Sequence, residues 1–338
     1  MRTKEYLVAL CISVLCITAN AQILKPEHLK HGDTVALVAP GFQFDKDKLT
    51  FAVRRLKALG LNPIYDKNIL DNYGYFAGMA QVRAKEINGA INNPKVKAII
   101  ALRGGYGTAD VLSQIDYQAL KKNPKIIMGY SDITALLTAV YDKTGLVSFH
   151  GPLGFSTWTP FTTAHVKAVL FGNSRNYVLK NQRKKNQDKD LIDLGNPDFT
   201  ITPGVAKGTI IGGNLSVLVS LIGTPYFPKD WKGKILFLED VGEDVYSIDR
   251  MLGQLKHIGV LSQIAGFIFG TCSKCTSKVH GGFYLNEVLD HYIKPLGIPA
   301  YRGAMIGHQD NIFTVPVGLP VKLDANKKTI TLLESATK

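Results

Sequence analysis

The sequence has few cysteines and lacks the common signatures of zinc and nucleotide sites. Four cysteines occur in 338 residues, and no second Cys or His pair lies near Cys272 and Cys275 at zinc-finger spacing. The glycine-rich segment 103–107 is not followed by Gly-Lys-Ser or Gly-Lys-Thr, and it does not complete Gly-x-Gly-x-x-Gly. We therefore expect no zinc finger, no P-loop and no dinucleotide fingerprint.

The N-terminal apolar run is too short for a permanent membrane anchor. It covers residues 7–17, follows Arg2 and Lys4, and precedes Ala19-Asn20-Ala21, which has small residues at the two positions that a signal peptidase inspects. This pattern predicts a signal peptide over residues 1–21, cleaved after Ala21. We expect the mature chain to be exported, to be periplasmic, and to have no stable membrane insertion. The alternative is a buried N-terminal helix.

Export changes the interpretation of the cysteines. Cys11 and Cys16 would leave with the signal peptide, so the mature chain would keep Cys272 and Cys275. A Cys-x-x-Cys pair in an oxidising compartment is a disulfide or a redox pair. We expect either two thiols or one tight local disulfide at these positions, without a catalytic role.

Acidic residues are outnumbered by basic ones. The chain has 40 Lys and Arg against 27 Asp and Glu, a net charge of +13, and loss of the signal peptide leaves +12. Basic proteins can bind nucleic acid, but an exported protein rarely meets it, so we expect no nucleic acid partner. The densest basic run, 183–185, lies in a polar stretch without aromatic residues and is predicted to be a solvated linker.

Strand-like and helix-like segments alternate along the chain. Residues 33–41 and 96–102 are short apolar runs typical of buried strands, whereas 49–59 and 133–140 repeat apolar residues at helical spacing. This alternation predicts a parallel sheet with helices on both faces. Prolines and glycines weaken the pattern after residue 155, and strand-like runs resume near residue 208. We therefore expect four regions: a signal peptide (1–21), an N-terminal α/β domain (22–155), a linker (156–204) and a C-terminal domain (205–338).

Ser131 is the most informative candidate for catalysis. It stands in Gly129-Tyr130-Ser131-Asp132, between a strand-like run and a helical pattern. A sharp strand-to-helix turn exposes a hydroxyl, and the free N–H groups of a helix N-terminus stabilise a developing oxyanion. The segment is not Gly-x-Ser-x-Gly, so the α/β-hydrolase fingerprint is absent. A Ser before Asp at a helix start is more often a simple N-cap.

Glu239 and His308 are two further candidates. Glu239 closes an apolar strand-like run, where α/β proteins place functional side chains, but other acidic residues follow it closely. His308 lies in a loop, where a solitary His is usually structural or exposed. The order Ser, Glu, His is compatible with a catalytic triad, although order alone does not establish one.

The combined motifs resemble the LD-carboxypeptidase family, which also contains the microcin C immunity peptidases. The motifs occur in family order and are Gly104-Gly105-Tyr106-Gly107, Gly129-Tyr130-Ser131-Asp132, Gly212-Gly213-Asn214-Leu215, Leu238-Glu239-Asp240 and Gly307-His308. The resemblance extends from Val35 to about Leu333. We expect an α/β protein with an N-terminal flavodoxin-like sheet, a C-terminal α/β domain rich in strands, and an active site in the cleft between them.

The resemblance implies a triad of Ser131 as nucleophile, Glu239 and His308, with no metal and no cofactor. It further implies release of the terminal D-alanine from murein tetrapeptides by cleavage of an LD bond, and it suggests a homodimer. The implied oxyanion donors are backbone amides, those of Asp132 and of either Gly104 or Gly105. The best-known members act in the cytoplasm, so an export signal departs from the family.

Two alternatives to this reading stay open. A related serine peptidase could act on a peptidyl-nucleotide antibiotic. A non-catalytic envelope protein could bind muropeptides, but such a protein has no need for an activated serine.

Overall fold

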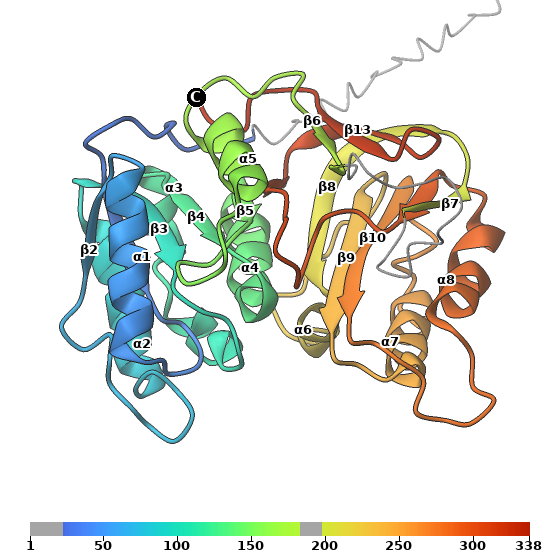
Figure 1. Ribbon diagram of the computed structural model, residues 1–338, viewed down its shortest axis with the longest axis horizontal. Coiled ribbons are helices and arrows are strands. Elements are labelled where there is room, and N and C mark those ends of the chain that lie inside the picture. The colour runs from blue at the N-terminus through green and yellow to red at the C-terminus, as the bar shows by residue number, and fades with distance from the viewer. Residues whose placement is uncertain (1–22, 183–197) are drawn as a thin grey trace, which may run out of the picture.

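The computed structural model describes residues 23–182 and 198–338, which form two α/β domains side by side (Figure 1). The predicted signal peptide, residues 1–21, and the basic run 183–185 lie outside the described residues. No helix in the described part of the chain has both the length and the apolar character needed to cross a membrane.

The N-terminal domain is built on a six-stranded sheet in the order β12-β5-β4-β3-β1-β2. Five of its strands run parallel, and they are β1 (Thr34–Val38), β2 (Asn62–Tyr65), β3 (Val96–Ala101), β4 (Ile126–Gly129) and β5 (Ser148–His150). The order 2-1-3-4-5 is that of flavodoxin-like folds, in which functional residues lie beyond the carboxyl ends of the strands. The predicted flavodoxin-like sheet is confirmed.

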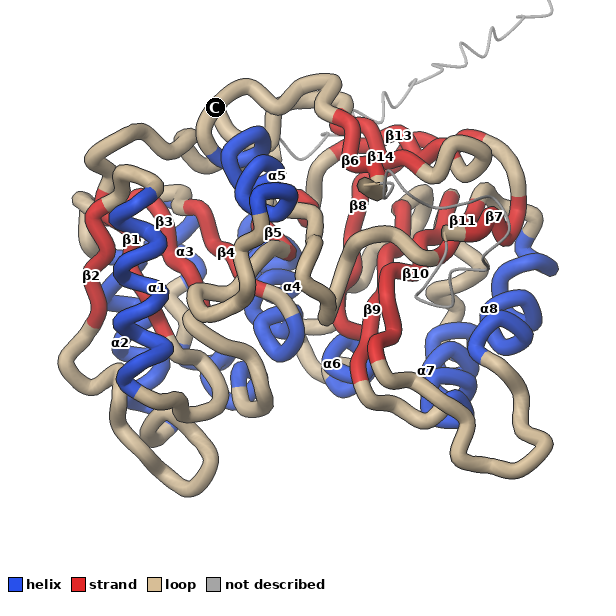
Figure 2. The backbone as a smooth tube through the Cα atoms, in the orientation of Figure 1, coloured by secondary structure: helices blue, strands red, loops and turns tan. Residues whose placement is uncertain are grey.

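Helices cover both faces of this sheet. The elements are α1 (Lys46–Ala58) and α5 (Pro160–Leu170) in one apolar cluster, and α2 (Ala80–Asn92), α3 (Tyr117–Lys122) and α4 (Thr134–Thr144) in the other (Figure 2). Val35 and Leu37 of β1 belong to the first cluster, whereas Ala36 and Val38 belong to the second. Successive side chains of a strand point to opposite faces, so a strand covered on both faces must be apolar throughout.

The C-terminal domain is built on an eight-stranded mixed sheet in the order β6-β14-β13-β8-β9-β10-β11-β7. Four central strands are parallel, namely β8 (Val205–Asn214), β9 (Ile235–Val241), β10 (Gly266–Ser273) and β11 (Ala300–Arg302). Antiparallel strands flank them, namely β6 (Val178–Lys180), β7 (Phe199–Thr202), β13 (Pro320–Asp324) and β14 (Thr329–Leu332). The helices are α6 (Leu215–Ser220), α7 (Val245–His257) and α8 (Leu285–Ile293).

The segment 156–204, expected to be a linker, contains regular structure. It includes α5, β6 and β7, and the two strands are only three and four residues long, too short to show a clear period of two. Pro160, one of the prolines that weaken the pattern after residue 155, occupies the first turn of α5 after the N-cap Thr159. Proline is favoured there because the first helical N–H groups have no partner within the helix.

The N-terminal sheet also includes a strand from beyond the expected domain boundary. β12 (Val315–Val317) pairs antiparallel with β5, so the chain crosses back to the N-terminal domain shortly after His308. The segment from His308 to β12 therefore connects the two domains directly beside the candidate residues.

Candidate active site

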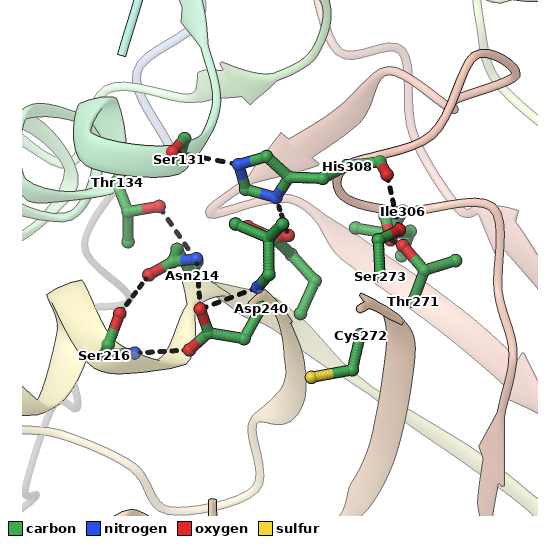
Figure 3. Close-up of polar contacts among 12 residues, drawn as sticks. Ser131, Thr134, Asn214, Ser216, Asp240, Thr271, Cys272, Ser273, Ile306 and His308 are labelled. Atoms are coloured by element: carbon green, nitrogen blue, oxygen red, sulfur yellow. Dashed lines mark hydrogen bonds and ion pairs between the residues drawn. The ribbon is translucent and has the colours of Figure 1, made fainter. Parts of the chain in front are cut away.

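Ser131, Glu239 and His308 meet in one chain of hydrogen bonds at the junction of the two domains. Figure 3 shows the contact between His308 and Ser131. His308 Nε2 lies 3.1 Å from Ser131 Oγ, and His308 Nδ1 lies 2.8 Å from Glu239 Oε2. The His308 side chain keeps 21% of its surface exposed, whereas the Glu239 side chain is completely buried. An imidazole held between a hydroxyl and a buried carboxylate is the arrangement that activates a serine.

Ser131 stands at a sharp turn after β4. Its φ of +64° is left-handed, a conformation that costs a non-glycine residue roughly 1 kcal/mol and that gathers at functional sites. The turn Ser131–Ile133 is a short 3₁₀ segment that leads into α4, whose N-cap is Ile133. The hydroxyl of Ser131 is directed to His308, and the simple N-cap considered from the sequence does not describe it.

Gly104 lies directly against the candidate nucleophile. A Cβ at this position would lie 3.0 Å from Ser131 Cβ and 3.2 Å from Ser131 Oγ, so a side chain here would crowd the serine, and it would lie 3.4 Å from the backbone N of Asp132, an ordinary contact distance. A Cβ on Gly105 would instead lie 2.5 Å from the ring of Phe42. Of the two glycines that the sequence left open, Gly104 is therefore the one that borders Ser131 and the amide of Asp132.

The Asp132 side chain fixes the glycine loop beside Ser131, a role that the sequence did not suggest. Its Oδ2 accepts hydrogen bonds from Thr108 N at 2.9 Å and from Thr108 Oγ1 at 2.6 Å. Burial raises the pKa of Asp132, and the bonds from Thr108 oppose that change. Because Thr108 follows the loop 103–107 directly, these bonds hold the loop next to Ser131.

The surroundings of His308 favour its protonated form. Burial alone lowers the pKa of His308, but the hydrogen bond and the charge of Glu239 outweigh burial, so the pKa is raised. Gly307 permits the close approach, since its φ is +110° and a Cβ there would lie 2.5 Å from Glu239 Oε2. The ring of Tyr130 meets the imidazole edge-on at 5.0 Å.

A buried polar network behind Ser131, Glu239 and His308 was not predicted. Asn214 N donates to Thr134 Oγ1 at 2.9 Å, and Asn214 Nδ2 donates to Asp240 Oδ1 at 3.1 Å (Figure 3). Asp240 Oδ2 accepts from Ser216 N at 2.9 Å. Burial first, and the charge of Glu239 second, raise the pKa of Asp240 to about 6. The motifs around Asn214 and Asp240 were noted in the sequence, but the bond from Asn214 to Thr134 joins the two domains and has no local signal.

Cys272 and Cys275 form a disulfide, one of the two states that the sequence left open. In residues 23–182 and 198–338, no group of three or more His, Cys, Asp and Glu side chains could hold a metal ion.

Two family models match most of the described chain. The LD-carboxypeptidase N-terminal domain matches residues 35–151, and the LD-carboxypeptidase C-terminal domain matches residues 207–323. The probable murein peptide carboxypeptidase of Bacillus subtilis is 38% identical over 311 residues, which cover 90% of this chain and 93% of that protein. The murein tetrapeptide carboxypeptidase of Pseudomonas aeruginosa is 29% identical over 299 residues, which cover 87% of this chain and 94% of that protein.

Solved structures of similar proteins share the fold. The microcin C7 self-immunity protein MccF in its apo state superposes with a TM-score of 0.83 at 26% identity, covering 93% of this chain and 100% of that one. The muramoyltetrapeptide carboxypeptidase from Oxalobacter formigenes superposes with a TM-score of 0.74 at 30% identity, covering 88% of this chain and 97% of that one.

Proposed function

The chain belongs to the LD-carboxypeptidase family, and on that basis we propose that Ser131, Glu239 and His308 cleave murein tetrapeptides at the LD bond before a terminal D-alanine. The observation that carries the proposal is the position of His308, whose two ring nitrogens face Ser131 and Glu239. Ser131 is 177 positions from His308 in the chain, and Glu239 is 69 positions from it. A loop histidine with a merely structural role does not need two such distant partners.

Acylation follows from this geometry. As Ser131 Oγ attacks the carbonyl carbon of the scissile amide, His308 Nε2 takes the hydroxyl proton over the 3.1 Å contact. Glu239 accepts the Nδ1–H bond, which selects the reactive tautomer and offsets the positive charge that develops on the ring. The Asp132 amide, with Gly104 beside it, is proposed to hold the oxyanion, an effect of about 3 kcal/mol per donor in other hydrolases.

Acylation ends when His308 gives its proton to the amine of the departing D-alanine as the C–N bond breaks. In deacylation, His308 accepts a proton from the water that attacks the acyl-enzyme, and it returns that proton to Ser131 when the ester bond breaks. Every proton in this cycle passes through one imidazole. His308 must therefore be neutral at the start of each turnover.

We also propose that the chain is exported to the periplasm after cleavage behind Ala21 and acts there as a homodimer. The N-terminal sequence pattern supports export. The Cys272–Cys275 disulfide gives independent support, because disulfides persist in oxidising compartments. N-terminal sequencing of the exported protein tests cleavage, and a chain that still begins at residue 1 would contradict it. Sedimentation of the mature chain tests the homodimer, and a monomer would contradict it.

The test of the activity uses a defined murein tetrapeptide and mass spectrometry. We expect the loss of one alanine with the native chain and no loss with Ser131→Ala. Aspartyl sulfamoyl adenosine, the ligand in one solved complex of MccF, serves as the competing substrate. Cleavage of that compound with an intact tetrapeptide would overturn the murein assignment, and a tetrapeptide that binds without cleavage would favour the non-catalytic alternative.

A further inference from the structure

His308 lies in a loop between β11 and β12, and the end of β10 holds that loop in place. Thr271 donates both its N–H, at 2.9 Å, and its Oγ1, at 3.0 Å, to the carbonyl of Ile306. Ser273 Oγ donates at 2.5 Å to the carbonyl of His308 itself (Figure 3). The Ser273 bond is the one that reaches the backbone of the candidate catalytic base.

Ser273 is itself fixed on two sides. On one side, its carbonyl accepts a bond from Gly242 N at 2.8 Å, and it lies opposite Val241 in the register of β9 and β10. On the other side, the disulfide joins Cys272, directly before it, to Cys275. The cross-link thus closes a four-residue turn around the side chain that bonds to His308.

The same strand end serves the acid of the triad. Cys272 lies opposite Asp240 in the β9–β10 register, and Asp240 directly follows Glu239. The ends of β9 and β10 therefore carry the disulfide, Ser273 and the proposed triad acid Glu239. A structural change in the turn 272–275 would affect His308 through the Ser273 hydrogen bond, and it would occur next to the strand end that carries Glu239.

We propose that Ser273 is a positioning residue for His308 and that the Cys272–Cys275 disulfide keeps Ser273 in place, so that a thiol reductant lowers turnover. This inference rests on the proposed triad. Reduction transfers two electrons and two protons to the disulfide and yields two thiols, while a dithiol reductant becomes a disulfide. The freed turn no longer confines Ser273, its bond to His308 is populated less, and the imidazole departs from its 3.1 Å contact with Ser131.

The effect is local because the cross-linked loop is short. Disulfide stabilisation through chain entropy grows with loop length, so a separation of three residues contributes less to global stability than a long-range cross-link would. Catalytic geometry is far more sensitive, since a displacement of about 1 Å can cost a hundredfold in rate. Reduction should therefore lower kcat while the fold persists. KM should stay near its original value, because the Ser273 hydroxyl bonds to the backbone of His308 and is not proposed to bind the substrate.

The experiment compares Ser273→Ala, Ser273→Thr and the double variant Cys272→Ser/Cys275→Ser with the native chain. Ser262→Ala is the matched control, because the Ser262 hydroxyl also donates to a backbone carbonyl, that of Gly259, on an exposed turn. Two readouts are taken with and without dithiothreitol: the rate at which a fluorophosphonate labels Ser131, and kcat and KM for the murein tetrapeptide. Thermal unfolding of every variant is recorded.

We expect labelling and kcat to fall by about tenfold or more in Ser273→Ala and in the reduced native chain. Ser273→Thr, which keeps the hydroxyl, should recover most of the rate, and the double variant should be slow and insensitive to dithiothreitol. Equal labelling of Ser273→Ala and the native chain, or no response to complete reduction, would overturn the inference. A native chain that labels without cleaving the tetrapeptide refutes only the substrate assignment, whereas absent labelling refutes the triad and this inference together.

Discussion

The backbone amide of Asn214 donates a hydrogen bond of 2.9 Å to Thr134 Oγ1, and this bond joins the two domains next to the nucleophile. Thr134 begins α4, three residues after Ser131. Asn214 ends β8, where it lies opposite Glu239 in the register of β8 and β9. The bond therefore links the helix behind the nucleophile to the strands that hold the acid.

Replacing Thr134 by Val tests this link. The variant keeps the shape of the side chain but leaves the buried Asn214 amide without its acceptor, which should cost about 1–3 kcal/mol of unfolding free energy. We expect kcat to fall as well, because the two halves of the triad lose a shared restraint. Thr134→Ser keeps the acceptor and is the control. The measurements are denaturant unfolding and kcat. Equal unfolding free energies and equal kcat values for Thr134→Val and Thr134→Ser would contradict the link.

Substitutions of Ser131 should separate catalysis from backbone strain. Ser131→Ala and Ser131→Gly both remove the hydroxyl, so neither should turn over substrate. Glycine accepts a φ of +64° without strain, whereas alanine does not, so the glycine variant should be more stable than the alanine variant by about 1 kcal/mol. Turnover and unfolding free energy are the measurements. Activity in either variant would show that Ser131 is not the nucleophile. A glycine variant that is less stable than the alanine variant would show that the backbone at Ser131 is not strained.

The raised pKa of His308 predicts the acid side of the pH profile. The imidazole must be neutral to accept the Ser131 proton, so kcat/KM should fall as the pH drops through a pKa above the ordinary histidine value of 6.5. Glu239→Gln removes the charge that outweighs burial, and the pKa of His308 should then be lowered. We expect the acid limb of kcat/KM to move to lower pH while the maximum drops at least about a hundredfold. An unmoved limb would show that Glu239 does not control this imidazole.

Gly307→Ala should inactivate the site because the new methyl group would clash with the carboxylate of Glu239. The added Cβ would lie 2.5 Å from Glu239 Oε2, and φ at this position is +110°. Gly297→Ala is the matched control, since its φ of +64° is also left-handed but no heavy atom lies within 4 Å of its Cβ position. Both variants should lose stability through backbone strain, but only Gly307→Ala should lose most of kcat. Equal activity of the two variants would contradict the contact.

Local patterns predicted the nucleophile turn, and long-range contacts account for what they missed. A strand-like run, Gly129-Tyr130-Ser131 and a helical pattern are contiguous in the sequence, so the strand-to-helix turn was visible there. The contact between Thr134 and Asn214 spans 80 positions and depends on how two sheets meet. No periodicity within either segment carries that information.

The choice between neighbouring residues of one type also needed the structure. The sequence gives no reason to prefer Gly104 or Gly105, but in the structure Gly104 lies next to Ser131 and Gly105 lies next to Phe42. The same is true of Glu239 and the acidic residues that follow it, because successive side chains of a strand face opposite sides. Family resemblance selected Glu239, and the 2.8 Å contact with His308 gives the physical reason.

Glu86, on α2, should make stability depend on pH. Its side chain is 8% exposed, and burial first, then the charges of Asp66 and Asp71, raise its pKa to about 8 from the ordinary glutamate value of 4.5. Between these two values the folded state keeps a proton that the unfolded state releases, so the unfolding free energy must fall as the pH rises. Glu86→Gln cannot titrate and should be more stable than the native chain at pH 8 by at least about 1 kcal/mol, with the difference shrinking towards pH 4.5. Denaturant unfolding at both pH values measures this, with Glu27→Gln, at an exposed glutamate, as the control. A constant difference between Glu86→Gln and the native chain across this range would mean that the Glu86 carboxyl is ionised in the folded protein, against the effect of its burial.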